Sequence, residues 1–259
     1  MPWSQSQRAG LTSFRSRPPW LVVVLSRWPA PGRCKRRLAR SIHPVAAATI
    51  QSRLLVHVLS LTQPLVREGL AHRRLAVTGA GLKAWRRWLA PLGYSTRGTS
   101  LGRQGGGNLG CRMARQVRWG LARHYRGVVL LGSDCLGLET GDLRQALHLL
   151  SVGEKPLVLG PARDGGYWLM GQRCFDAGLF SDVPWGGPAV GSLTRKRAGA
   201  SGFQVHTLCS RADVDRLEDL QPWLAVLNRN GITSELPAAI DLNSTYAVGR
   251  CTSAVDPGW

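Results

Sequence analysis

The sequence contains no apolar run near the roughly 20 residues that a membrane-spanning helix needs. Its first twenty residues carry three arginines and no acid but lack an apolar segment, which argues against a secretory signal and leaves a transit peptide as a weak alternative. The six cysteines form no Cys-x-x-Cys pair and have no accompanying His-x-x-x-His, which argues against a structural zinc site or a disulfide framework. We therefore expect free thiols, a cytoplasmic location and no transmembrane segment.

Acidic residues are almost absent from the first half of the chain. The segment before Asp134 carries 23 Lys and Arg residues and one acid, Glu68, whereas 11 basic residues and 14 acids follow from Asp134 onward. A strongly basic balance can indicate nucleic-acid binding. The arginines alternate with apolar positions, however, and no recognised nucleic-acid-binding module is present. We therefore expect the first half to attract small anions and the second half to supply carboxylates.

Short apolar runs alternate with amphipathic segments along most of the sequence. The predicted strands are 21–25, 74–78, 94–96, 128–131, 157–159, 167–170 and 204–208, and the predicted helices are 45–61, 82–89, 108–123, 142–150 and 216–227. This alternation predicts an α/β fold with a mainly parallel sheet. We expect one domain over 21–231, an irregular N-terminal extension over 1–20 and a C-terminal extension over 232–259.

A short apolar run rich in β-branched residues, Val128 to Leu131, ends abruptly in Gly132-Ser133-Asp134. Such a run is typical of a buried parallel strand. Ligands of open α/β sheets bind beyond the carboxyl ends of the strands, so Asp134 is placed where chemistry occurs. Its carboxylate would hold Mg²⁺ or Mn²⁺ through a substrate's phosphates, or accept a hydrogen bond from a ribose hydroxyl. The alternative is an aspartate that forms a turn or caps a helix.

A loop rich in proline and glycine follows the first predicted strand and leads into a basic segment. It reads Pro29-Ala30-Pro31-Gly32-Arg33-Cys34-Lys35-Arg36-Arg37-Leu38. Backbone N–H groups and a helix N-terminus would bind a diphosphate there, and Lys or Arg would add full charge. The pattern is neither a P-loop nor Gly-x-Gly-x-x-Gly. The alternative is a solvated basic turn.

Two further carboxylate motifs follow in the second half. Asp164-Gly165-Gly166-Tyr167 combines a charge with two glycines that permit close backbone approach to a ligand, although Asp-Gly is also a strong hairpin signal.

In Asp213-Val214-Asp215 the two carboxylates would share one side of an extended backbone, which suits a cation. The alternative for Asp215 is the N-cap of the following helix, with Glu218 completing a capping box.

Together the motifs resemble those of a bacterial GT-A-like family of largely unknown function, whose members are identified as glycosyltransferases and in some cases linked to arsenosugar biosynthesis. The matching motifs, from about Leu21 to Asn228, are Pro29-x-Pro31-Gly32 with Lys35-Arg36-Arg37-Leu38, Gln104 to Met113, Gly132-Ser133-Asp134-Cys135, Gly160 to Tyr167, and Asp213-Val214-Asp215. Departures lie at Arg36, Asn108 and Leu136, where the family has Thr, Asp and Pro. Trp185 is kept, but Gly186-Gly187 replaces Ser-Thr after it.

The resemblance implies a GT-A, Rossmann-like sheet flanked by helices, and transfer of a sugar from a nucleotide-activated donor to a small acceptor. The catalytic residues that it implies are Asp134, Asp164 and Asp215, and the ligands of Mg²⁺ or Mn²⁺ are Asp134, Asp213 and Asp215. The implied nucleotide-binding residues are Pro31, Gly32, Lys35, Arg37, Gln104 and Ser133, with Lys35 and Arg37 on the diphosphate. The implied substrate-binding residues are Gly165, Gly166, Tyr167 and Trp185. The general base and the stereochemistry of transfer stay open.

Two other functions fit the same residues. Phospholactate and molybdenum-cofactor guanylyltransferases resemble this chain in architecture, which implies nucleotidyl transfer from an NTP as an alternative, and the basic first half would suit a triphosphate. A catalytically inactive nucleotide-binding module is the third interpretation.

Overall fold

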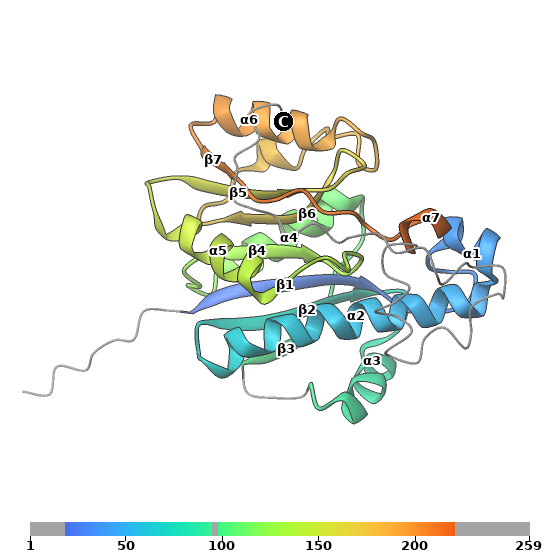
Figure 1. Cartoon of the computed structure of the whole chain (residues 1–259). Coiled ribbons are helices and arrows are strands. Elements are labelled where there is room, and N and C mark those ends of the chain that lie inside the picture. The colour runs from blue at the N-terminus through green and yellow to red at the C-terminus, as the bar shows by residue number, and fades with distance from the viewer. Residues whose placement is uncertain (1–18, 95–97, 221–259) are drawn as a thin grey trace, which may run out of the picture.

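The computed structural model describes residues 19–94 and 98–220. Over these ranges the chain forms a seven-stranded sheet in the order β3-β2-β1-β4-β6-β5-β7 (Figure 1). The strands are β1 (Trp20–Arg27), β2 (Ala71–Thr78), β3 (Thr99–Arg103), β4 (Val128–Gly132), β5 (Pro156–Pro161), β6 (Tyr167–Gln172) and β7 (Gln204–Thr207). Strand β6 runs antiparallel to β4 and β5, and the other neighbouring pairs are parallel. The predicted mainly parallel α/β sheet is therefore confirmed.

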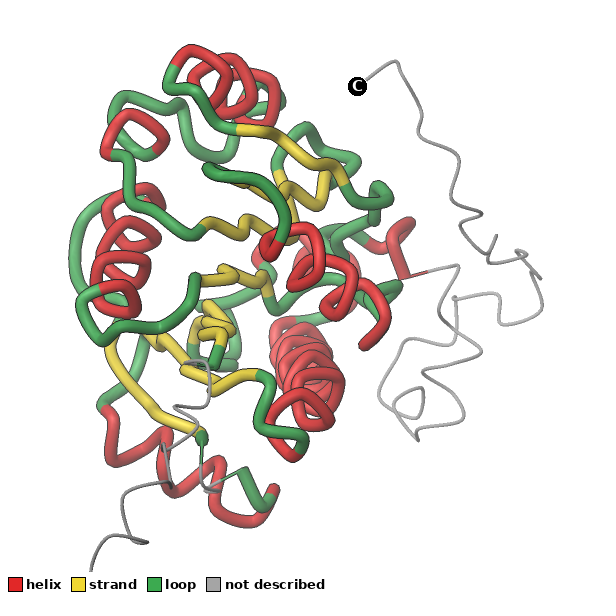
Figure 2. Tube along the Cα trace, turned by 90° about the vertical axis from the view of Figure 1, so that its left-hand side faces the viewer, coloured by secondary structure: helices red, strands yellow, loops and turns green. Residues whose placement is uncertain are grey.

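Helices cover both faces of this sheet, as the view turned by 90° shows (Figure 2). They are α1 (Arg36–Ile42), α2 (Pro44–Arg67), α3 (Leu82–Leu89), α4 (Leu109–Leu121), α5 (Thr140–Ser151), α6 (Val190–Ala200) and α7 (Leu217–Leu220), with short 3-10 helices at Ala90–Leu92 and Ala177–Leu179. Residues of α2, α3 and α5 pack in one hydrophobic cluster, and residues of α4 and α6 pack in another on the opposite face.

Strand β1, which lies between β2 and β4, is apolar from Trp20 to Leu25. Val22 and Val24 face the cluster that contains α2 and α5, whereas Leu21 and Val23 face the cluster that contains α4 and α6. All four side chains are at most 1% exposed. A parallel strand that is covered on both faces needs apolar residues at every position, because no side chain reaches water.

Helix α2 is long and apolar enough to cross a membrane by length and composition alone, with a mean hydropathy of 1.3 in its most apolar window. That window is 56% buried within the protein. The helix packs on β1, β2 and α5, and its buried residues include Leu54, Leu55 and Val58. Packing against the sheet therefore accounts for its apolar composition.

Two arginines of the first half, Arg73 and Arg74, are buried in the fold and are not exposed on the surface. Arg73 is fully buried in β2, where its guanidinium donates to the Leu59 carbonyl at 2.8 Å and to the Thr62 hydroxyl at 3.0 Å. Burial lowers the pKa of Arg73 to about 10. Arg74 lies over the ring of Trp119, 3.8 Å from its centroid. Part of the basic excess is therefore structural.

Some sequence predictions need correction. The third strand lies at Thr99–Arg103, a short edge strand that has few apolar residues to mark it, and the prediction at 94–96 falls mostly outside the described residues. Residues 95–97, 1–18 and 221–259 lie outside the described residues, so the two extensions and most of the predicted helix over 216–227 stay predictions. Cys34, Cys111, Cys135 and Cys174 are free, but Cys209 is disulfide-bonded, so the expectation of free thiols is wrong for that residue.

The turn at Gly165 depends on a close approach between two segments. Gly165 has φ of +87°, and a Cβ there would overlap the backbone carbonyl of Pro188 in the loop before α6. We expect Gly165→Ala to lower the free energy of unfolding by about 1–3 kcal/mol or more, because backbone strain and a clash with main chain both oppose folding. Thermal unfolding measures this. Gly141→Ala, in α5 with open space around it, is the control and should leave Tm within a few degrees of wild type.

Candidate active site

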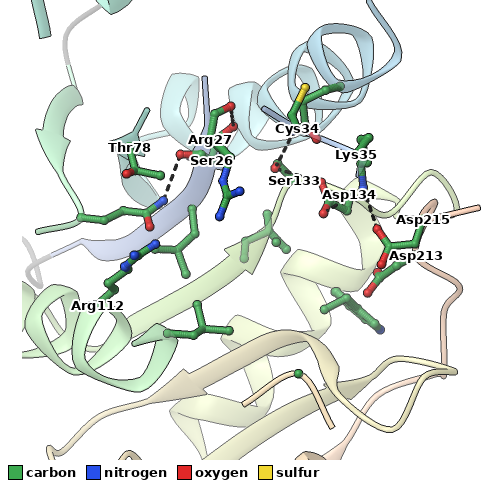
Figure 3. Close-up of a pocket in the computed structure, with 18 of the residues that line it drawn as sticks. Ser26, Arg27, Cys34, Lys35, Thr78, Arg112, Ser133, Asp134, Asp213 and Asp215 are labelled. Atoms are coloured by element: carbon green, nitrogen blue, oxygen red, sulfur yellow. Dashed lines mark hydrogen bonds and ion pairs between the residues drawn. The ribbon is translucent and has the colours of Figure 1, made fainter. Parts of the chain in front are cut away.

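A cleft of about 770 Å³ lies at the carboxyl ends of β1, β2 and β4. Its walls come from the end of β1, the loop before α1, the first turn of α4, the residues after β4 and the segment before α7. Figure 3 shows Lys35, Asp134, Asp213 and Asp215 gathered toward one side, while Ser26, Arg27, Thr78 and Arg112 lie toward the other. We call the first group the acid cluster, which also includes Asp164, and the second group the basic end.

The backbone next to β4 fixes the position of Asp134. The Asp134 carbonyl accepts a hydrogen bond from Val214 N at 3.0 Å, and Cys135 forms a β-bridge with Asp213. These contacts bring the residues after β4 and the segment before α7 side by side. Helix α5 begins later and has its own capping box between Glu139 and Asp142. The alternative that Asp134 caps a helix is therefore wrong.

A hydrogen-bond chain orients the Asp134 carboxylate. Ser133 Oγ donates to Asp134 Oδ1 at 3.2 Å, and Gln51 Nε2 of α2 donates to Ser133 Oγ at 3.3 Å. Gln51 and Ser133 are 4% and 5% exposed, so water has little access to the amide and the hydroxyl and does not compete for these hydrogen bonds. No motif in the sequence marks Gln51, because it is a single amide in an apolar helix.

Lys35 lies inside the acid cluster and not on the surface. Its Nζ is 3.0 Å from Asp134 Oδ2 and 3.3 Å from Asp215 Oδ1, and its side chain is 2% exposed. Burial alone would lower the pKa of Lys35, but the charges of Asp134 and Asp215 outweigh it and raise the pKa. The solvated-turn alternative is therefore wrong for this lysine. The structure also places its ammonium on carboxylates, whereas the sequence predicted it on a diphosphate.

The pKa of Asp213, another member of the cluster, is strongly perturbed. Burial, followed by the charges of Asp134 and Asp164, raises its pKa to about 7. The attraction of Lys35 lowers the pKa by less than these effects raise it. Asp134 and Asp164 therefore lie close enough to repel Asp213, although they belong to separate loops.

The carboxylate of Asp215 is free to join the cluster. Asp219 Oδ2 accepts hydrogen bonds from the backbone N of Asp215 at 2.9 Å and of Arg216 at 2.7 Å. Asp219 thus does the capping that the sequence assigned to Asp215 and Glu218. The Asp215 carboxylate pairs instead with Lys35 and, at 3.5 Å, with Arg37.

Exposed arginines surround the mouth of the cleft beside the acid cluster. They are Arg33, Arg36, Arg37 and Arg40, and they come from the loop before α1 and from α1 itself. Pro31 and Gly32, predicted to bind nucleotide, are exposed and do not line the cleft. The side chains of this loop, rather than its proline and glycine, thus face the cavity.

The basic end is organised by Gln104, which follows β3. Its Nε2 donates to the carbonyls of Ser26 and Ala76, each at 3.0 Å, and so ties the ends of β1 and β2 together. Gln104 lines the cleft as predicted. The sequence did not single out Arg27, Thr78 or Arg112, which line the same end.

The predicted substrate-binding residues divide into two groups. Tyr167, together with Asp164, lines the cleft. Gly165 and Gly166 do not line it, because Gly165 packs against the Pro188 backbone and Asp164 Oδ1 accepts from Gly166 N at 2.9 Å. The predicted close approach at these glycines is real, but it is made by another loop of the chain and not by a ligand.

Trp185 does not line the cleft either. Its indole lies against Gly110 at the start of α4 and meets the ring of Tyr167 edge-on, with centroids 6.4 Å apart. It therefore supports Tyr167, and the neighbouring Gly186 lines the cavity instead.

The acid cluster has the chemistry of a Mg²⁺ or Mn²⁺ site. In the part of the chain that the structure describes, no group of three or more His, Cys, Asp or Glu side chains is arranged to hold a metal ion. Mg²⁺, however, is usually held by one or two carboxylates together with substrate phosphates and water. Asp134 and Asp213, which repel one another across adjacent backbones, fit that smaller requirement.

Residues 61–187 match a family model described as an uncharacterised protein conserved in bacteria (DUF2064). This part of the chain is similar to that family. The matched region contains Gln104, Asp134 and Asp164, whereas Lys35, Asp213 and Asp215 lie outside it. A search of curated proteins gives no match.

Solved structures share the fold. A protein from Desulfovibrio desulfuricans, described as a candidate nucleotide-diphospho-sugar transferase, is 25% identical, with 83% of this chain and 90% of that chain covered and a TM-score of 0.70. A CMP:2-keto-3-deoxy-manno-octonic acid synthetase complexed with CTP is 11% identical, with 82% and 99% covered and a TM-score of 0.51. The resemblance to a GT-A-like bacterial family of unknown function, and the predicted fold class, are therefore confirmed.

Asp213 also gives a pH-dependent prediction. Its pKa in the folded protein, about 7, lies above the ordinary value of 3.8, so the unfolded chain releases this proton at lower pH than the folded protein does. Its contribution to stability is therefore present below pH 4 and is lost as pH rises through 7. We expect Asp213→Asn to raise Tm relative to wild type at pH 8, and the gain to shrink as pH falls toward 4.

Thermal unfolding of both proteins at pH 4, 6 and 8 checks this. Asp182→Asn, which removes an exposed carboxylate that does not line the cleft, should give the same small change at each pH. A gain for Asp213→Asn that is independent of pH would show that Asp213 is not held under repulsion.

Proposed function

We propose that this protein is a transferase that binds a nucleotide-activated donor in the cleft and transfers a group, in the first instance a sugar, to a small acceptor. The observation that carries the proposal is the convergence of Asp134, Asp213 and the buried Lys35 beneath a rim of arginines. This convergence lies beyond the carboxyl ends of parallel strands, where α/β sheets bind their ligands. The 25% identical neighbour described as a candidate nucleotide-diphospho-sugar transferase supports the same class.

The donor's phosphates would lie between the acid cluster and the arginine rim. Arg33, Arg36, Arg37 and Arg40 are exposed there and can each offer a planar, charged donor pair to phosphate oxygens. Asp134 and Asp213 would bind a divalent cation together with the donor's phosphates. Ser133 keeps the Asp134 carboxylate oriented. That cation would neutralise charge that develops on the leaving phosphate.

The nucleoside would occupy the basic end of the cleft. Gln104 has both amide hydrogens committed to the Ser26 and Ala76 carbonyls, so only its oxygen remains to accept a hydrogen bond. Arg27 and Arg112 supply donors beside it. An end with one fixed acceptor and several donors suits a polar heterocycle and its ribose.

The acceptor would enter beside Asp164 and Tyr167. The Oδ1 atom of Asp164 accepts from the Gly166 backbone, and its Oδ2 has no partner within residues 19–94 and 98–220. We therefore assign Asp164 to the acceptor's hydroxyl group. A hydroxyl held by this carboxylate would be a better nucleophile, because its proton has an acceptor nearby.

Nucleotidyl transfer from an NTP is the second candidate, and one observation favours it. Four arginines at the cleft mouth, in addition to Arg27 and Arg112, provide more positive charge than two phosphates require. Incubation with nucleotide sugars and with NTPs, each with Mn²⁺, separates the two reactions. Glycosyl transfer or donor hydrolysis releases a nucleoside diphosphate or monophosphate, whereas nucleotidyl transfer releases pyrophosphate. Nucleotide binding without turnover of any donor, over a broad set of acceptors, would indicate an inactive module.

Asp134 is the residue on which donor binding with metal should depend most. Asp134→Asn keeps the size of the side chain but removes the charge that pairs with the cation. We expect turnover to fall on the order of 10²-fold, as for removal of one well-placed electrostatic group. Steady-state kinetics with the donor found above measures this, and Asp182→Asn should keep wild-type rates. A variant Asp134→Asn with unchanged metal-dependent turnover would place the active site elsewhere.

A further inference from the structure

The acid cluster already contains a cation, the ammonium group of Lys35. Lys35 Nζ contacts Asp134 Oδ2 at 3.0 Å and Asp215 Oδ1 at 3.3 Å, and its side chain is 2% exposed. The ammonium therefore occupies one coordinating face of Asp134, while Ser133 Oγ contacts the other oxygen. Both oxygens of the carboxylate that best suits a metal are taken by the protein itself.

Simultaneous binding of a divalent cation and this ammonium to Asp134 is unfavourable. Like charges a few ångströms apart repel strongly when water is excluded. The repulsion of Asp213 by Asp134, Asp164 and Asp215 is offset in part by Lys35, and Arg37 also pairs with Asp215. A metal bound to Asp134 would also neutralise the carboxylates. The ammonium of Lys35 would then be attracted less by Asp134 and would be repelled by the metal.

Lys35 lies beside the arginines near which the donor's phosphates are proposed to bind. Its backbone lies in the left-handed region, with φ of 44°, at the residue before α1. Its chain neighbours Arg36 and Arg37 line the mouth of the same cleft. Rotation of one long side chain would therefore move the ammonium from the carboxylates to phosphates without moving the fold.

We propose that Lys35 is a placeholder cation, which holds the acid cluster together until a divalent metal and a nucleotide arrive together, and then exchanges Asp134 for the nucleotide's phosphates. This inference rests on the proposed function. It makes the binding of metal and nucleotide cooperative, since the metal needs Asp134 vacated and the ammonium needs phosphate oxygens to receive it. By reciprocity each ligand raises the affinity for the other by the same factor.

The test is a titration of Mn²⁺ alone, followed by electron paramagnetic resonance, with wild type and Lys35→Gln. Removal of the placeholder should let Mn²⁺ bind the cluster at least about tenfold more tightly than it binds wild type, within the range of ordinary coupling between sites. The same titrations with ADP, CDP, GDP and UDP should show a large increase in Mn²⁺ affinity for wild type and a much smaller one for Lys35→Gln. Weaker or equal Mn²⁺ binding by Lys35→Gln, with Mn²⁺ alone, would overturn the proposal.

Arg37→Gln is the matched control, because it removes one positive charge from the same loop and the same partner, Asp215. The Arg37 side chain is 63% exposed, so its loss should change the affinity for Mn²⁺ alone only slightly. An equal gain in both variants would attribute the effect to net charge and overturn the placeholder role. If neither wild type nor Lys35→Gln bound Mn²⁺ in the presence of any of the four nucleotides, the result would instead contradict the proposed function itself.

A second pair of variants covers the case in which Lys35→Gln does not fold. The double variant Lys35→Gln/Asp215→Asn removes one charge of each sign, and Asp215→Asn is its reference. The double variant should bind Mn²⁺ alone more tightly than Asp215→Asn does. Equal affinities would overturn the proposal, because Lys35 would then have no influence on access to Asp134.

Discussion

The repulsion among the carboxylates of the acid cluster is the constraint on which the arrangement of this site depends. Strand β4 and the segment before α7 are joined by the hydrogen bond from Val214 N to the Asp134 carbonyl and by the bridge between Cys135 and Asp213. That pairing forces acidic side chains together in a partly buried cleft. The ammonium of Lys35, held 3.0 Å from Asp134 and 3.3 Å from Asp215, offsets the repulsion.

The cluster carries a cost in stability that is typical of functional sites. A carboxyl whose pKa is raised to about 7 by burial and by neighbouring charges opposes folding at neutral pH. Packing alone would not select such an arrangement, since a neutral side chain at position 213 would avoid the penalty. Strongly perturbed ionisation in a cleft is therefore an argument for binding or chemistry.

The fold separates positive charge that is buried in packing from positive charge that lines the cleft. Arg73 of β2 donates a hydrogen bond to a backbone carbonyl, and Arg74 of β2 contacts a side-chain amide and an aromatic ring. The arginines of α1 and of the loop before it face the cleft mouth instead. The uneven charge of the sequence thus has two causes, and under the proposed function only one of them concerns a ligand.

The sequence by itself determined the mainly parallel α/β class of the sheet and the position of Asp134, because an apolar run that ends in Gly-Ser-Asp reports a local property, burial on both faces of one strand. It also marked the loop around Lys35 and the pair Asp213 and Asp215 as unusual. Only the tertiary structure decided their partners. Lys35 and Asp215 are 180 residues apart, and no periodicity carries information across that distance.

The same limit explains what the sequence missed or misassigned. Gln51 is one amide in an apolar helix, and its role follows only from the side of α2 that meets Ser133. The glycine at position 165 was correctly seen as a point of close approach, but whether the neighbour is a ligand or the backbone of Pro188 depends on how α6 packs. Local patterns fix which residues form elements, whereas long-range packing fixes which side chains meet.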